Sequence, residues 1–397
     1  MPLPAGTTHG CQQTAINSPM NSSISTPTSV TWIPEHPAYG SISMMRYWMM
    51  LNAAKLPDDP FTCESVLPLG TRYRPPFCQS AQRVISRRVT YPVRIKLRAK
   101  GDIVHILDHS WSDMLPYTPR PALKVITVHD LIPLRFPGEL SPTQAGRFRS
   151  WISYLSQADV IIADSAYTKQ EIEKLLGIDG AKIHVVLLGV ELPDLRPSEA
   201  GPVFLPPRGT GDGNFRVGSI GSTLKRKNLG IFPAALARLR QLTRRKVVLV
   251  RCGMPLPQAL AAELRQELGD DGLIELGRLP DAAIGPYYAG LDVVALPSTY
   301  EGFGLPVIEG MANGIPVVCS SNTSLPEVGG GNVLYFNPMD SEEFAHRLAD
   351  VAAGRLPADW TKQAYDRARQ FTWRATLEGI YQVYSTLLEQ RPTIQHP

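Results

Sequence analysis

Cysteine is scarce in this chain, and its spacing excludes two kinds of site. The 397 residues include an odd number of cysteines with no Cys-x-x-Cys pair, namely Cys11, Cys63, Cys78, Cys252 and Cys319. Scattered cysteines of this kind suit neither a zinc site nor a disulfide framework. We therefore expect no metal, and we expect a cytoplasmic protein, because cytoplasmic thiols stay reduced.

Long hydrophobic runs and a strong charge imbalance are also missing. No apolar run approaches the ~18 residues that cross a bilayer. Residues 1–29 lack the charged start and apolar core of a signal peptide, and their richness in Ser, Thr, Pro and Asn predicts a disordered tail. The net charge of +4 is too weak to indicate a nucleic-acid partner.

What the chain does contain is an alternation of predicted strands and helices, which is typical of an α/β protein with parallel sheets. The expected strands are residues 30–33, 102–107, 124–128, 158–163, 183–186, 215–220, 246–250, 273–276, 293–296 and 316–319. The expected helices include residues 43–51, 150–157, 168–176, 228–242 and 374–390. Pro and Gly crowd residues 193–213, which indicates a linker between domains of residues 30–192 and 214–373. Two Rossmann-like halves with a cleft between them is the simplest architecture.

Residues 298–309 carry the most informative pattern. They follow the buried-type strand 293–296 and place Glu301 and Glu309 eight residues apart, with Gly302 and Gly304 between them. Pro306 suits the first turn of a helix, which Gly314 would close in a left-handed conformation. A helix N-terminus suits a phosphate, and carboxylates accept hydrogen bonds from hydroxyl groups. The segment therefore predicts a site for a nucleotide sugar.

A second pattern places three cations after the strand 215–220. The small residue Gly221 opens the turn, and Lys225, Arg226 and Lys227 precede the helix expected from residue 228. Small residues let the backbone approach a ligand, and cations neutralise a diphosphate. Cations at a helix N-terminus also oppose the macrodipole, so a bound anion would offset that cost. A solvated basic turn is the alternative.

A third pattern is a His-Asp pair, His129 and Asp130, at the end of the strand 124–128. The carboxyl ends of parallel strands present ligand-facing residues. His129 could donate a hydrogen bond to a sugar hydroxyl, or the pair could simply bond locally around the strand end. The neighbouring sequence Asp108-His109 follows another strand, and it could serve the acceptor side of a site or have only a structural role.

These motifs together resemble those of retaining glycosyltransferases of family 4, which have the GT-B fold. The resemblance covers about residues 100–390. It implies two Rossmann-like domains facing across a cleft, with the last segment, residues 374–397, packing back on the first domain. Gly310 and Asn313 depart mildly from the family pattern, which usually has Ala and then Cys or Ser at these positions.

The resemblance also implies a role for each candidate residue. Catalytic roles near the sugar and the diphosphate would fall to four residues, His129, Arg226, Lys227 and Glu301. Donor-binding roles would fall to Glu309 at the ribose, Arg278 at the base, and the backbone of Gly221, Gly302, Phe303, Gly304 and Leu305.

The implied activity is transfer of a hexose, with retention of configuration, to a hydroxyl acceptor. The donor would be of the GDP-mannose or UDP-hexose type, and the acceptor a glycan or a lipid-linked glycan in polysaccharide, lipopolysaccharide or glycolipid assembly. The motifs hold neither a glycosidase-type carboxylate nucleophile nor an Asp-x-Asp metal motif, so neither a metal nor a cofactor is expected. The alternatives are another GT-B enzyme, such as a phosphorylase or an epimerase, and a non-catalytic nucleotide-sugar-binding partner. A dinucleotide oxidoreductase fits poorly because no G-x-G-x-x-G pattern follows a strand with an acidic residue at the right distance.

One basic stretch lies outside these motifs. Seven cations and no acid occur from Arg83 to Lys100, with apolar residues interleaved. A basic amphipathic surface can lie on anionic lipid, which would make the protein peripheral at the inner face of a membrane. The alternative is a solvated basic face.

Overall fold

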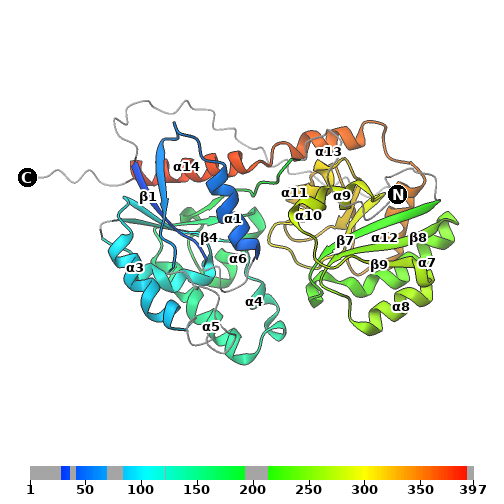
Figure 1. The fold of residues 1–397 in the computed structure, drawn as a ribbon, viewed down its shortest axis with the longest axis horizontal. Helices are drawn as coiled ribbons and strands as arrows, with labels where there is room; N and C mark the ends of the chain where they lie inside the picture. The colour runs from blue at the N-terminus through cyan, green and yellow to red at the C-terminus, as the bar shows by residue number, and fades with distance from the viewer. Residues whose placement is uncertain (1–27, 36–41, 69–83, 121, 193–212, 391–397) are drawn as a thin grey trace, which may run out of the picture.

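A computed structural model describes residues 28–35, 42–68, 84–120, 122–192 and 213–390 (Figure 1). Parts of four predictions therefore lie outside the described residues. These are the tail before Thr28, the linker at 193–212, the first residue of the basic stretch, Arg83, and the last segment after residue 390. Thr28 and Ser29 belong to the first strand, so the bounds of 1–29 predicted for the tail include two residues too many.

The first half of the chain builds a six-stranded parallel sheet in the order β2-β1-β3-β4-β5-β6. Its strands are β1 (Thr28–Ile33), β2 (Phe61–Ser65), β3 (Ile103–Ile106), β4 (Leu123–Val128), β5 (Val160–Ala163) and β6 (Ile183–Val185). The inner strands β3 and β5 are buried along their whole length, as expected for β-branched runs covered by helices on both faces. β2 was not predicted from the sequence, because its residues alternate between buried and exposed and include polar side chains.

The second half builds another six-stranded parallel sheet, in the order β12-β11-β10-β7-β8-β9. Its strands are β7 (Asn214–Gly221), β8 (Lys246–Gly253), β9 (Leu273–Glu275), β10 (Val293–Leu296), β11 (Val317–Ser320) and β12 (Leu334–Phe336). The α/β class and the two parallel sheets expected from the sequence are confirmed. The short strand β12 was missed.

Helices cover both sheets (Figure 1). Those of the first half are α1 (Ile42–Ala53), α3 (Tyr91–Arg98), α4 (Ile132–Arg135), α5 (Pro142–Ile152) and α6 (Ala166–Leu176). The helix predicted at 168–176 is confirmed as α6, which starts two residues earlier. The Ser165 side chain caps it by accepting from Thr168 N, and it ends at left-handed Gly177. The helix predicted at 150–157 is wrong in its bounds. A capping box at Ser141 and Gln144 starts α5 at Pro142, and residues 153–157 form a 3-10 turn.

The second half contributes eight α-helices within the described residues: α7 (Phe232–Thr243), α8 (Gln258–Leu268), α9 (Ile284–Ala289), α10 (Leu305–Ala312), α11 (Leu325–Gly329), α12 (Ser341–Ala352), α13 (Trp360–Ala368) and α14 (Trp373–Glu389). Shorter 3-10 segments are His109–Tyr117, Pro137–Glu139, Ser153–Gln157, Gly180–Lys182, Lys225–Lys227, Leu229–Ile231, Asp270–Gly272 and Asp281–Ala283. A π-helical turn, Ser86–Thr90, leads into α3.

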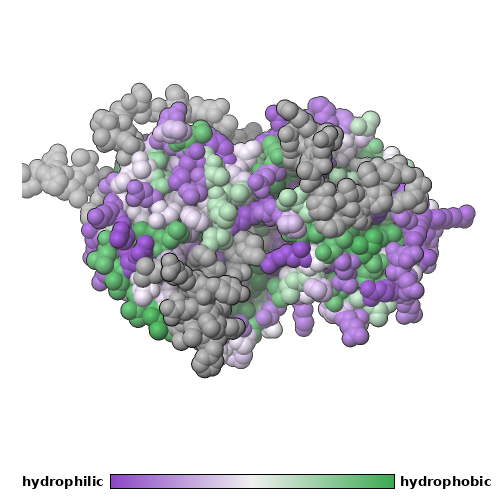
Figure 2. Space-filling view, in the orientation of Figure 1, coloured by the Kyte–Doolittle hydropathy of each residue, from purple (hydrophilic) through white to green (hydrophobic). Residues whose placement is uncertain are grey.

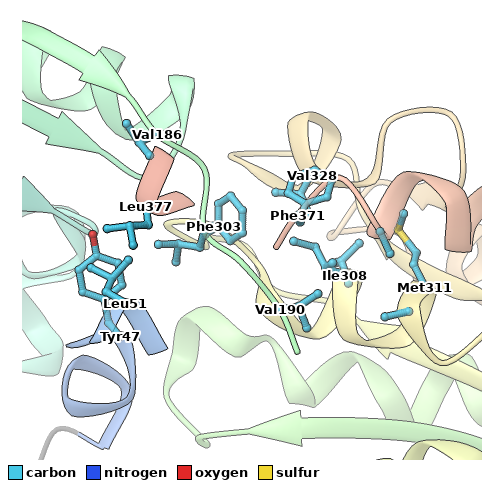
Figure 3. Close-up of a cluster of buried hydrophobic side chains, with 14 of the residues drawn as sticks. Tyr47, Leu51, Val186, Val190, Phe303, Ile308, Met311, Val328, Phe371 and Leu377 are labelled. Carbon is cyan, nitrogen blue, oxygen red and sulfur yellow. The ribbon is translucent and has the colours of Figure 1, made fainter. Parts of the chain in front are cut away.

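The last helix, α14, lies against the first half of the chain. Trp32 Nε1 in β1 donates to Tyr384 Oη at 3.1 Å, and that hydroxyl lies 2.6 Å from His105 Nδ1 in β3. Figure 3 shows the hydrophobic cluster at the junction, where Val186 of the first half and Leu377 of α14 lie near Phe303 and Phe371 of the second half. One core cluster therefore includes residues of both halves. Within the described residues, no helix is long and apolar enough to cross a membrane.

Candidate active site

The loop between β10 and α10 builds the centre of the site. Gly304 has φ +107, which favours glycine, and a Cβ there would lie 2.5 Å from Leu325 Cδ2. This turn places Glu301 on the loop and Glu309 in α10, as predicted from the sequence. Gly314 is left-handed just after the helix end, as was also predicted.

Glu301 is buried and receives hydrogen bonds from three side chains. Lys227 Nζ donates to Oε1 at 2.6 Å, Arg226 Nη1 donates to Oε2 at 3.2 Å, and Ser298 Oγ donates to Oε1 at 2.6 Å. Burial by itself would raise the pKa of Glu301, but Lys227 and Arg226 hold it below its usual value. The structure therefore brings together three of the four residues predicted to be catalytic, in an ionised cluster.

The turn carrying these cations differs from the prediction. Residues 225–227 form a 3-10 turn that ends at left-handed Asn228, and α7 begins only at Phe232. Arg226 and Lys227 therefore do not lie at the N-terminus of a long helix, and the argument from the macrodipole is wrong. Glu301 stabilises their charge instead, and the backbone N–H of Arg226 donates to Glu139 Oε1 of the other half at 3.2 Å.

Glu309 lies in α10, where the charge of Arg46 from the first half of the chain reaches it. Tyr288 Oη donates to its Oε2 at 2.7 Å. Burial raises the pKa of Glu309, while the positive charge of Arg46 in α1 acts in the opposite direction. A carboxylate held by one hydroxyl keeps further acceptor positions, which a ribose could use.

Gly302 makes a close contact between the two halves. A Cβ on Gly302 would lie 2.4 Å from His129 O, and its own carbonyl accepts hydrogen bonds from Ser165 Oγ at 2.8 Å and Thr168 Oγ1 at 3.2 Å. Glu327 adds to this contact, because both of its carboxylate oxygens accept from Ala166 N at the start of α6. The glycine is thus required here by domain packing, which sequence reasoning had not considered.

The remaining predicted donor-binding residues come from different elements. Phe303 is buried against Phe371, with ring centroids 6.2 Å apart, and its carbonyl accepts from Ser324 Oγ. Gly221 ends β7 with φ +118. Arg278 is exposed on the turn after β9, and no ion pair joins it to the charged cluster in the described part of the chain. A base-side role for Arg278 therefore stays a prediction.

His129 directly follows β4 and is buried, with both ring nitrogens bonded inside the protein. Nδ1 lies 2.6 Å from Asp164 Oδ2, and Nε2 lies 2.9 Å from Leu107 O. Burial alone would lower the pKa of His129, but Asp164 raises it to about 9. The protonated ring donates both bonds, so contact with a sugar would require one of them to break. Asp130 bonds locally, since its Oδ1 accepts from Ile132 N.

We expect the free energy of unfolding to fall as the pH rises through about 9. The pKa of His129 is about 6.5 in an unfolded chain and about 9 in the folded one. The ion pair with Asp164 therefore stabilises the protein fully below about pH 6.5 and loses this effect through about pH 9. The loss is up to about 3 kcal/mol. Denaturant unfolding of wild type and His129→Gln across this range measures it; parallel pH profiles for the two proteins would contradict it.

Several residues of the site carried no sequence signal. Arg46, Tyr288 and Glu139 come from distant segments, and neither spacing nor motif pointed to them. Ser298 is the first residue of the stretch 298–309, but no role was predicted for it. Within the described residues, no group of three or more His, Cys, Asp or Glu side chains could hold a metal ion.

Both halves of the chain match known protein families. Residues 214–353 match the family described as Glycosyl transferases group 1, and residues 54–193 match Glycosyltransferase Family 4. The two matches together span more than half of the chain. The first match covers the whole second sheet, and the second covers the first sheet except β1.

Two individual relatives and one solved structure show how similar the chain is to known proteins. The chain is 29% identical over 310 residues to O-antigen chain mannosyltransferase B of Escherichia coli, which covers 76% of this chain and 79% of that protein. It is 27% identical over 245 residues to MMP alpha-(1->4)-mannosyltransferase of Mycolicibacterium hassiacum, covering 59% of this chain and 56% of that one. Among solved structures, HepE of Anabaena in complex with UDP and glucose has a TM-score of 0.64 at 16% identity, with 90% of this chain and 100% of that chain covered. At this identity the likeness shows the fold alone.

Proposed function

The chain belongs to the group 1 glycosyltransferases of family 4, with the GT-B fold, and we propose that it moves a hexose from a nucleotide sugar to a hydroxyl group with retention of configuration. The donor is of the GDP-mannose or UDP-hexose type, and mannose is the first sugar to test, because two of the relatives above are mannosyltransferases. The acceptor is a glycan or a lipid-linked glycan of an envelope polysaccharide, lipopolysaccharide or glycolipid. The name of the first relative, which refers to an O-antigen chain, supports this class.

The observation that carries this proposal is the contact of Lys227 and Arg226 with Glu301. The two cations lie beside the loop that leads into α10, at hydrogen-bond distance from a carboxylate. A diphosphate beside them would have its charge balanced by the two cations. Glu301, released in part from its cations, could then accept a hydrogen bond from a sugar hydroxyl.

The proposed reaction takes place on one face of the sugar. The acceptor oxygen forms a bond to the anomeric carbon while the bond from that carbon to the phosphate oxygen breaks. The acceptor proton passes to the departing diphosphate. Lys227 and Arg226 stabilise the negative charge that develops on this leaving group, which is the part of the reaction that fixed charges accelerate most.

Donor binding and turnover test the proposal together. Thermal unfolding is followed with GDP, UDP, GDP-mannose and UDP-glucose, and nucleotide release is then measured with the donor that stabilises the protein. We expect one nucleoside diphosphate series to raise the melting temperature and its sugar to be hydrolysed slowly in the absence of acceptor. Stabilisation by none of them, with no nucleotide released, would contradict the proposal. Binding without any release or transfer would favour a non-catalytic partner.

We also propose that α3 docks the protein on an anionic membrane. Five apolar side chains on the outer side of the helical segment 84–98 are more than half exposed: Val84, Ile85, Val89, Val93 and Leu97. From residue 85 onward they recur every fourth position, so they form one stripe. Figure 2 shows hydrophobic residues beside strongly hydrophilic ones on the side where Figure 1 places α3.

The inner side of this segment is fixed to the domain. Arg87, counted among the surface cations in the sequence, is buried instead. Its guanidinium lies 3.8 Å from the centre of the Trp151 ring and bonds Asp113 at 2.7 Å. The exposed cations Arg88, Lys96, Arg98 and Lys100 flank the apolar stripe. A preformed apolar stripe between cations fits an anionic lipid surface.

Vesicle binding checks this surface. Val93→Glu combined with Leu97→Glu should lower co-sedimentation with phosphatidylglycerol vesicles at least about tenfold, because two apolar anchors are lost and two negative charges added. Met339→Glu is the matched control, since Met339 is the most exposed large apolar residue among those the structure describes but lies in the other half. Binding of wild type that is absent, or unaffected by the double substitution and by salt, would count against membrane docking.

A further inference from the structure

Arg251 is a buried cation in β8 that the sequence motifs do not include. Its side chain is only 2% exposed and bonds four neighbouring groups. Nη2 donates to the carbonyls of Gly221 and Ser222, the latter at 2.9 Å. Nη1 donates to Cys252 O at 3.2 Å and contacts Ser219 Oγ at 3.5 Å. Arg251 therefore holds the end of β7 and the first residue of the turn that follows it.

None of these four partners carries a formal charge, and no carboxylate forms an ion pair with Arg251 in the part of the chain that the structure describes. Burial removes the guanidinium from water and lowers the pKa of Arg251, and Tyr287, Cys252 and Glu275 only partly oppose the effect. Burying a charge without an opposite charge is costly for a protein. An anion bound close to Arg251 would offset this cost.

The position of Arg251 links it to the site. Gly221, whose carbonyl it binds, also lies beside Lys227: a Cβ on Gly221 would be 3.8 Å from Lys227 Nζ. Two cations therefore flank one residue, and Lys227 has Glu301 as its partner. Gly253 allows this arrangement, because a Cβ there would lie 2.3 Å from Gly221 O.

The bonds of Arg251 also set the direction of two amide groups. In a planar trans peptide, the N–H points opposite to the carbonyl of the preceding residue. Since the carbonyls of Gly221 and Ser222 point to Arg251, the N–H groups of Ser222 and Thr223 point away from it. Neither has a hydrogen-bond acceptor among the described residues. Ser222 Oγ is likewise a buried atom without a partner there.

We propose that Arg251 is a positioning residue for the donor diphosphate: it turns the N–H groups of Ser222 and Thr223 toward the phosphates and places a second positive charge behind them. Successive N–H groups that face one anion form a strong phosphate site. The bound diphosphate supplies the negative charge that Arg251 lacks. This inference rests on the proposed function, because it requires a nucleoside diphosphate in the site beside Lys227.

The test compares two ligands that differ by one phosphate. Calorimetry measures the affinity of the nucleoside diphosphate that stabilises wild type, GDP or UDP, and of the matching monophosphate. Arg251→Met should weaken the diphosphate at least about tenfold and the monophosphate less than about threefold, because the lost contacts serve the added phosphate. A merely structural role would change both affinities alike.

Arg245→Met is the matched control. Arg245 also bonds backbone carbonyls, at Asn214 O and Ala352 O, but at the opposite end of β7. Its substitution should leave both affinities within about twofold of wild type.

If Arg251→Met does not fold, the same two affinities are measured on Arg251→Lys. This variant keeps the positive charge but lacks the planar guanidinium that bonds two carbonyls at once. A ratio of diphosphate to monophosphate affinity unchanged in a folded Arg251 variant overturns the inference while leaving the function intact. A wild type that binds neither nucleotide overturns the proposed function instead.

Discussion

Replacing Lys227 with alanine should lower turnover by at least about 100-fold, corresponding to a few kcal/mol of transition-state stabilisation. Lys227 Nζ lies 2.6 Å from Glu301 Oε1, so the substitution removes a charge at the point where the leaving group would develop its own. It also leaves the buried Glu301 carboxylate with one cation, Arg226, in place of two. Both effects act against a transition state that carries negative charge. The measurement is kcat for nucleotide release.

The neighbour Lys225 provides the control. It lies in the same 3-10 turn, but it is exposed and should be replaceable by alanine with less than about a twofold change in kcat. Wild-type turnover in Lys227→Ala would remove this turn from the active site. Equal losses in Lys225→Ala and Lys227→Ala would point to a general effect of surface charge.

Replacing Glu309 with alanine should raise the KM for the donor and weaken nucleoside diphosphate binding at least about tenfold. Hydrogen bonds from hydroxyl groups to a carboxylate contribute about 1.5–3 kcal/mol each. Glu309 is the carboxylate of α10, the helix that follows the loop proposed to bind the diphosphate. The bond from Tyr288 Oη fixes only one of its oxygens, Oε2. We expect kcat to change much less than KM, because the ribose does not react.

A deoxyribose analogue makes this prediction specific. Wild type should bind the nucleoside diphosphate about tenfold better than its 2′-deoxy form, and Glu309→Ala should bind both equally. Glu342→Ala is the control carboxylate, since Glu342 is exposed on α12 and pairs with Arg238. A ribose preference that survives in Glu309→Ala would place the ribose elsewhere.

The family match also bears on the alternatives left open by the motifs. Matches to transferase families over both halves favour a glycosyltransferase over a dinucleotide oxidoreductase, as the missing G-x-G-x-x-G pattern had indicated. Turnover of a nucleotide sugar separates this function from a phosphorylase. A phosphorylase of the glycogen type would instead show the absorbance of a pyridoxal Schiff base.

The sequence by itself determined the local features. The apolar run of β10 is fully buried as predicted, and Gly314 adopts the left-handed conformation predicted after the end of α10. These features follow from hydrophobic periodicity and from steric limits on the backbone, which act over a few neighbouring residues. Glu301 and Glu309 were found for the same reason, because one short segment holds both of them.

Only the tertiary structure decided which groups meet. The contact of Lys227 with Glu301 joins residues 74 positions apart, and that of Gly302 with Ser165 joins residues 137 positions apart. Spacing could not show that Arg87 points inward, that both nitrogens of His129 already have partners, or that Arg251 lies beneath the Gly221 turn. Such pairings depend on the order of strands in each sheet and on how the two halves pack, which short-range sequence patterns do not encode.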